Sequence, residues 1–319
     1  MSTGAISIRA VSDASDRGRL IEIVNETTPD DPTSLEALTW SDETYPGTTR
    51  LLADLDGTPV GVATAGRIHV YPADHEAFWA TIAVRPIARC QGIGTQLLVA
   101  VSEHARAAGK TALHVPVSEA RPDGIKFLRN RGFHELERSK TVRLDLAGVL
   151  PPPIEPPAGT ELRTLAQAPA LVGGVHAVAL EAIADIPGGE TAMAAGDLAE
   201  FQARDVDRPG IPPEAFFIAL DRASGRVVGY ASLIMKAGSS TTAWHDMTAV
   251  LRSWRGQGIA GALKRALIGW AVANGLVALE SGNDEDNAPM RAVNARLGYQ
   301  PLPDRLTMRG PLFDGIMTR

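Results

Sequence analysis

One segment of this 319-residue chain occurs twice. The run VRPIARCQGIGTQLL, which begins at Val84, has a counterpart, VLRSWRGQGIAGALK, which begins at Val250. The offset between them is 166 residues (250 − 84), and it still relates Gly132-Phe133 to Gly298-Tyr299. A constant offset over about 50 residues indicates two copies of one structural unit. Two copies are too few for a solenoid, so the repeat predicts a tandem of similar domains.

A proline-rich segment separates the two copies. Residues 147–160, AGVLPPPIEPPAGT, contain five prolines. Proline interrupts helices and central strands, so this segment is predicted to be a stiff linker. The boundary is placed near Pro152, which gives an N-terminal domain of residues 1–150 and a C-terminal domain of residues 151–319.

The hydrophobic periodicity predicts the same order of elements in each copy. Antiparallel strands come first, and a strand–helix–strand unit follows, so each copy is predicted to form a mixed α/β sheet with one parallel crossover. In the first copy the predicted elements are strands 6–11, 77–84, 111–117 and 139–146, helices 20–26, 92–109 and 123–131, and a hairpin, 50–71. In the second they are strands 161–165, 244–250 and 277–282 and a final strand, helices 171–186, 191–205, 258–273 and 287–297, and a hairpin, 215–236.

The glycines of residues 256–261 spell G-x-G-x-x-G, the fingerprint of a dinucleotide-binding turn, and Glu280 follows roughly 20 residues later. The repeat argues against that interpretation, because Gly256 aligns with Cys90 and Gly261 with Thr95. The position also differs, since a nicotinamide-binding fold carries its glycine turn after the first strand. A nicotinamide enzyme is therefore a minor alternative.

Both copies share R-x-x-G-x-[G/A] between a strand and a helix. A helix N-terminus offers unpaired backbone N–H groups and the positive end of the helix dipole. Glycine or alanine at this point allows a phosphate group to approach the backbone closely. The loops are therefore predicted to bind a diphosphate, with Arg89 or Arg255 near the phosphates.

These residues resemble those of the GNAT superfamily of acyl-CoA-dependent N-acetyltransferases. The shared pattern is V-x4-R-x-Q-G-x-[G/A], then a helix, a strand, a short helix and Gly-Phe or Gly-Tyr. The resemblance implies two tandem GNAT-like domains, each with a splayed central pair of strands, with the diphosphate of coenzyme A on the loop and its pantetheine arm between the strands. The residues that it implies for cofactor binding are Val84, Arg89, Gln91, Gly92, Gly94 and Thr95 in the first copy, and Thr248, Val250, Arg255, Gln257, Gly258, Ile259, Ala260, Gly261, Asn283 and Asn287 in the second.

The resemblance also directs attention to the strand before the second loop. Asp246 and Thr248 precede Val250 there, and strict alternation would set all three on one face. We take Asp246 as the candidate general base, because a base must lie beside the amine that it deprotonates. His245 is expected on the opposite face as a packing residue, although a β-bulge would reverse the two.

A second candidate at the site of chemistry is Asn294. Many members of the superfamily have a tyrosine four residues before the final Gly-Phe, where it protonates the leaving thiolate. This chain has Leu128 and Asn294 at those positions. Asn294 can form hydrogen bonds but is a poor proton donor, so the general acid stays open. Asn287 is expected to cap a helix and also to contact the pantetheine arm.

The composition limits the class of protein. The formal net charge is -6, which argues against nucleic acid as a partner. Cys90 is the one cysteine and there is no run of 18 apolar residues, so a cytoplasmic protein without a membrane span is expected. The histidine spacing predicts no metal site. A monomer or a homodimer fits these observations.

Together these observations predict an N-acyltransferase that moves an acetyl group from acetyl-CoA to a primary amine of a small molecule or peptide. The second copy is the expected catalytic domain, because the first has Ala80 and Ile82 in place of the polar residues near Val250. Two alternatives remain: a regulatory module that binds acyl-CoA without transfer, and catalysis in the first copy.

Overall fold

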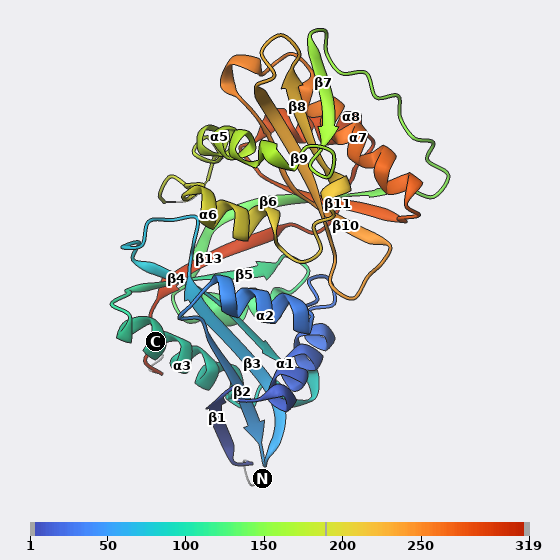
Figure 1. Ribbon diagram of the computed structural model, residues 1–319. Helices are drawn as coiled ribbons and strands as arrows, with labels where there is room; N and C mark the ends of the chain where they lie inside the picture. Colours follow the sequence, from blue (N-terminus) through green and yellow to red (C-terminus); the bar gives the residue numbers. More distant parts are fainter. Residues whose placement is uncertain (1–3, 189, 316–319) are drawn as a thin grey trace. The chain divides into compact units, whose positions relative to one another are not determined.

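The computed structural model describes residues 4–188 and 190–315, and the chain divides into two compact units (Figure 1). Unit 1 comprises residues 1–138 and 304–319, and unit 2 comprises residues 139–303. Each unit contains a mostly antiparallel sheet with one parallel pair of strands, so the predicted mixed α/β fold is confirmed.

The sheet of unit 1 has helices on both faces. Helices α1 (Ala14–Thr27) and α2 (Leu35–Thr44) enclose a core with Leu52 and Val62, whereas α3 (Ile93–Ala107) and α4 (Pro122–Arg129) pack on the neighbouring Ala53 and Ala63. Neighbouring residues of a strand point to opposite faces, so the two cores lie on opposite sides of the sheet. The strand order is β1 (Ile6–Ala10), β2 (Thr49–Leu55), β3 (Thr58–Arg67), β4 (Ala77–Val84), β5 (Ala112–Ser118) and β13 (Arg305–Pro311).

Unit 2 repeats this plan. Gly229 lies against Ile259 at the start of α7 (Ile259–Ala273), while the adjacent Tyr230 meets Phe201 of α6 (Leu198–Phe201) on the other face. The remaining helices are α5 (Val172–Ile183) and α8 (Ala288–Arg296). The strand order is β6 (His134–Asp145), β11 (Ala278–Asp284), β10 (Thr242–Val250), β9 (Val227–Met235), β8 (Phe216–Asp221) and β7 (Thr160–Thr164), and the short β12 (Gln300–Pro301) also pairs with β6.

The last strand of each copy completes the sheet of the other unit. Residues 139–145 of β6 pair antiparallel with β11 of unit 2, and β13, at the end of the second copy, pairs antiparallel with β5 of unit 1. The boundary expected near Pro152 therefore differs from the structural division at residues 138/139 and 303/304. The proline-rich linker belongs to unit 2, where Pro157 lies beside Gly258.

Two further expectations need correction. The helix expected over residues 191–205 begins only at Leu198, because Gly196 has a left-handed φ of 76° and Asp197 caps the helix that follows. Its continuation, Gln202–Val206, is a π-helical turn. Helix α2 was not expected; Ser34 starts it by accepting a hydrogen bond from the amide of Ala37.

The strand contributed by the C-terminus can be tested at Gly310. A Cβ atom at this position of β13 would lie 2.3 Å from the ring of Phe133, so Gly310→Ala forces the ring or the strand to move. We expect the substitution to lower the free energy of unfolding by roughly 1–3 kcal/mol, measured in urea by circular dichroism. Gly18→Ala is the control, since nothing lies within 4 Å of a Cβ there. Equal stability of the two variants would contradict this packing.

Candidate active site

In both units the two parallel strands begin side by side and then separate. In unit 1, β4 and β5 are paired only from Ala77 to Trp79. In unit 2, β10 and β11 are paired only from Thr242 to Trp244, opposite Ala278–Glu280. Strand β10 nevertheless continues to Val250, paired with β9 on its other side. The splayed central pair expected from the resemblance is therefore present, and it opens one edge of β10 to a ligand with strand-like polar groups.

The glycine loop lies where each of these strands ends. Gly92 and Gly258, which cap the following helices, both have left-handed φ angles, 90° and 88°. The first helical hydrogen bonds run from Gln96 to Gly92 and from Ala262 to Gly258, so the amides of residues 93–95 and 259–261 precede the helical ladder. Each loop thus presents a short set of amides at a helix N-terminus, the geometry that favours an anion.

Arg89 and Arg255 hold the loops in the same way. Their Nε atoms donate to the carbonyls of Val84 and Val250, at 3.1 and 3.0 Å. The carbonyl of each valine is therefore already hydrogen-bonded within its own loop. Gln91 and Gln257 also correspond, since each Nε2 lies 3.4 Å from the carbonyl oxygen of the residue four positions earlier.

The free ends of the two arginines have different partners. Arg255 binds Asp185 at 2.8 Å, together with Arg252, and these two guanidinium groups lower the pKa of the Asp185 carboxyl to about 2, with Arg252 the larger cause. Arg89 pairs with Asp123 at 3.2 Å. Both side chains remain partly exposed, so each guanidinium is tied to its loop and still reaches solvent.

A β-bulge in β10 decides which polar residues face which helices. The register with β9 shifts between His245 and Thr248, so Asp246 and Met247 together lie opposite Ser232. Asp246 therefore shares a face with Tyr230 and α6, while Thr248 joins His245 on the α7 face. The expectation that Asp246, Thr248 and Val250 share one face is wrong, and His245 lies on the face expected for Asp246.

The Asp246 carboxylate lies in a polar, half-enclosed environment. Its side chain is 18% exposed, and an oxygen lies 3.6 Å from a guanidinium nitrogen of Arg208. Burial raises the pKa of Asp246 to about 6, with Arg208 and Arg204 opposing the rise and Asp205 adding to it. Nearby, the buried Ser232 hydroxyl has no hydrogen-bond partner within the part of the chain that the structure describes. The α6 face of β10 and β9 therefore carries the Asp246 carboxyl group, whose pKa is raised, and the Ser232 hydroxyl group, which is available to a ligand.

A second polar cluster lies on the α7 face of unit 2. Nζ of Lys264 donates to Oδ1 of Asn294 at 2.7 Å, and Nδ2 of Asn294 donates to Oδ1 of Asn283 at 2.7 Å. Nε2 of His245 is hydrogen-bonded to the hydroxyl of Tyr299. Asn283 of β11 and Asn294 of α8 are therefore in direct contact, and Lys264 of α7 is hydrogen-bonded to Asn294. Asn287 caps α8 as expected, accepting from Met290 at 3.3 Å.

The residues of this cluster that sequence reasoning missed are Lys264, Ser281 and Tyr299. The sequence carried one signal for the lysine: the offset of 166 residues aligns it with Leu98, a buried residue of the first copy.

In unit 1, two side chains pack against the residues that begin α3. The Phe127 ring is 3.4 Å from where a Cβ on Gly94 would be. The Arg131 guanidinium lies over that ring, 3.7 Å from its centroid, and donates to Oγ1 of Thr95 at 2.7 Å. Helix α4 is therefore fastened to the first turn of α3. The aligned residues of the second copy, Val293, Leu297 and Gly261, cannot make this contact.

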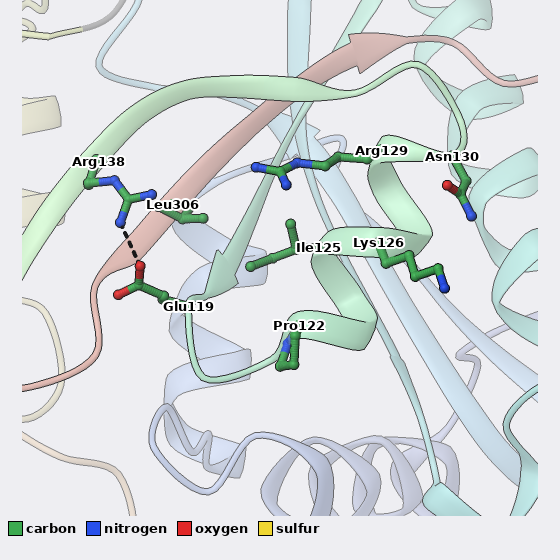
Figure 2. A pocket seen from close by; sticks show the side chains of 8 residues that line it. All are labelled: Glu119, Pro122, Ile125, Lys126, Arg129, Asn130, Arg138 and Leu306. Atoms are coloured by element: carbon green, nitrogen blue, oxygen red, sulfur yellow. Dashed lines mark hydrogen bonds and ion pairs between the residues drawn. The ribbon is translucent and has the colours of Figure 1, made fainter.

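A surface pocket of about 380 Å³ lies along α4 in unit 1 (Figure 2). The ion pair of Arg138 with Glu119 closes one side and Ile125 lines another. None of the loop residues 89–95 lines it, so it is separate from the anion-binding geometry described above.

Comparison with known proteins agrees with this geometry. The sequence model of the Acetyltransferase (GNAT) family matches residues 18–133 and 187–299. The chain therefore belongs to the GNAT acetyltransferase family, in a form with two copies of the domain. A search of curated protein sequences gave no match.

Solved structures share the fold over nearly the whole chain. A tandem GNAT protein from the clavulanic acid biosynthesis pathway has a TM-score of 0.75 at 21% identity, covering 97% of this chain and 99% of its own. A GCN5-related N-acetyltransferase from Sphaerobacter thermophilus has a TM-score of 0.73 at 18% identity, covering 98% of both chains. Across residues 4–188 and 190–315, no helix has the length and apolar character needed to cross a membrane.

The charge balance at Asp246 gives a prediction. Arg208→Ala removes a positive charge that favours the carboxylate, so the pKa of Asp246 should rise above about 6. Carbon-13 NMR of the aspartate carboxyls, with Asp246→Asn for assignment, measures the shift. Lys236→Ala is the control, because Lys236 pairs with Glu280 instead. An unchanged or lowered pKa in Arg208→Ala would show that Arg208 does not act on Asp246.

Proposed function

We propose that unit 2 transfers an acyl group, in the first instance acetyl, from acyl-CoA to a primary amine of a small molecule or peptide. The observation that carries the proposal is one continuous arrangement in β10: an edge opened beyond Trp244, a bulge that presents Asp246, and an anion-binding loop after Val250.

The proposed donor site follows the opened edge. The diphosphate of coenzyme A would accept hydrogen bonds from the amides of residues 259–261, and Arg255 would add a positive charge. The pantetheine arm would lie along the unpaired edge of β10, reaching the amide of Val250. The thioester would then lie close to the point where β10 and β11 separate.

The proposed reaction is a direct transfer. Asp246, as the carboxylate, accepts a proton from the amine, directly or through a water molecule. The amine nitrogen attacks the thioester carbonyl carbon, backbone N–H groups of β10 stabilise the oxyanion, and the C–S bond breaks to release coenzyme A as a thiolate. A carboxyl group whose pKa is about 6 is mostly ionised at neutral pH and is still basic enough to act.

The proposal assigns catalysis to unit 2 on two grounds. The first copy has Ala80 and Ile82 where a base would be needed. In addition, Phe127 packs against Gly94, and Arg131 donates to the Thr95 hydroxyl, contacts that the second copy lacks.

Asp246→Asn tests the base. We expect kcat to fall by roughly 10²–10⁴-fold with little change in the Kd for acetyl-CoA, because only proton transfer is lost. In the wild type, kcat/KM should rise with pH through about 6 as the carboxylate forms, and the variant should lack this rise. Asp205→Asn is the control, since Asp205 lies nearby and pairs with Arg204. Acyl transfer by Asp246→Asn at the wild-type rate would remove Asp246 from the mechanism.

Charge reversal tests which loop binds the donor. Arg255→Glu should weaken acetyl-CoA binding by more than about tenfold in calorimetry, because it sets a negative charge beside the diphosphate. Arg89→Glu is the matched variant on the loop of unit 1 and should leave the measured affinity unchanged if unit 2 binds the donor. The opposite order of effects would move the donor site to unit 1. Binding by the wild type without transfer to any of a broad set of amines would indicate an acyl-CoA-binding module.

A further inference from the structure

The buried lysine of α7 has no counterion within residues 4–188 and 190–315. Lys264 is 1% exposed, and its Nζ lies 2.7 Å from Oδ1 of Asn294 and 3.4 Å from Oγ of Ser281. Among the described residues, no carboxylate lies within ion-pair distance of this ammonium group. Burying an ammonium group without a counterion is costly, so its retention calls for an explanation beyond packing.

The first copy shows that the fold does not need this cluster. Residues aligned by the offset of 166 with five members of the cluster are apolar: Leu98 for Lys264, Val115 for Ser281, Val117 for Asn283, Leu128 for Asn294 and Phe133 for Tyr299. Leu98, Leu128 and Phe133 are buried in the core of unit 1. Unit 1 therefore forms the same fold with apolar side chains at these positions. Unit 2 has polar side chains at the same positions.

The ammonium group lies where the strands separate. Ser281 follows Glu280, the last residue of β11 that is paired with β10, and His245 follows Trp244, the last paired residue of β10. Lys264 contacts Ser281, and the Tyr299 hydroxyl contacts His245. Asn294, which binds Lys264, occupies the position where the resemblance to the family would have set a phenol.

We propose that Lys264 donates the proton taken up by the leaving thiolate. This inference rests on the proposed function. When the C–S bond breaks, its electron pair goes to sulfur; an N–H bond of the ammonium breaks, an S–H bond forms, and the neutral amine is reprotonated by solvent. Asn294 holds Nζ through its side-chain oxygen and is itself fixed by Asn283. Asn294 therefore acts as a positioning residue.

The charges around Lys264 suit this role. Burial lowers the pKa of its ammonium to about 7, close to the value that makes proton donation efficient at neutral pH. The titratable groups that face it are His245, whose pKa burial and Lys264 lower well below its usual value, and Tyr299, whose pKa burial raises. Both are neutral near pH 7, so the ammonium is the one proton donor with a charge in this cluster.

Kinetics of Lys264→Met test the inference. In the wild type, kcat should fall as the pH rises through about 7, because the neutral amine cannot donate. In Lys264→Met we expect kcat with acetyl-CoA to be at least about 100-fold lower and this alkaline fall to be absent, with the Kd for acetyl-CoA within threefold. A lysine with a merely structural role would instead change affinity and leave the pH profile in place.

The leaving group provides a second readout. The selenoester analogue of acetyl-CoA releases a more acidic selenol that needs less help from an acid, so the defect of Lys264→Met should shrink at least tenfold with it. An equal defect with both donors overturns the inference. Lys264→Leu/Asn294→Leu reproduces the apolar pair of the first copy and should show the same two effects if the single variant folds poorly.

Stability against pH shows whether the buried group is an ammonium. Because its pKa is lowered from 10.5 to about 7 on folding, the unfolded chain binds more protons between these values. The Tm should therefore rise with pH above about 7 in the wild type relative to Lys264→Met. Parallel Tm curves overturn the inference. Absence of transfer by the wild type overturns the proposed function as well, whereas transfer with an unaltered alkaline limb in Lys264→Met overturns this inference alone.

Discussion

The incomplete pairing of β10 with β11 is the constraint on which the rest of unit 2 depends. Parallel pairing stops after Trp244 and Glu280, although both strands continue. Beyond this point the backbone groups on the inner edge of β10 have no strand beside them, and unpaired buried backbone groups are costly. A ligand with an extended polar chain would satisfy them, so the proposed site for a pantetheine arm depends on the same geometry that weakens the sheet.

The bulge in β10 adds one residue to this strand relative to β9 and so changes which side chains face which helix. Without it, strict alternation would turn Thr248 and Asp246 toward the same helix, α7. With the extra residue, Asp246 lies on the α6 face with Ser232 and Tyr230, while His245 lies on the α7 face with Lys264. A single insertion thus separates the proposed proton acceptor, Asp246, from the proposed proton donor, Lys264, across the thickness of one strand. Two groups that would neutralise each other if adjacent can then hold pKa values of about 6 and about 7 independently.

Sequence reasoning succeeded where the determining pattern is local. The glycine loops and the helices that follow them depend on short segments with fixed φ requirements and clear periodicity, whereas the splayed strands were expected from the resemblance to the family. The exchange of β6 and β13 could not be predicted, because residues 139–145 and 305–311 are both strand segments, and either could border β5 or β11. The bulge was considered only as an alternative, since nothing in His245-Asp246-Met247 specifies where an extra residue is accommodated. Lys264 was missed because lysine in a helix is usually solvent-exposed, and only its alignment with Leu98 indicates burial.

The exchanged strands join the two copies of the sequence, although their cores differ. Each unit lacks an edge strand if the chain is cut at the linker, because β5 then loses β13 and β11 loses β6. The apolar residues of unit 1, among them Leu98, Leu128 and Phe133, form a core without buried charge in that region. Unit 2 carries the cost of a buried ammonium and a half-buried carboxylate. Since a domain is stable by only about 5–15 kcal/mol, such costs are large for unit 2.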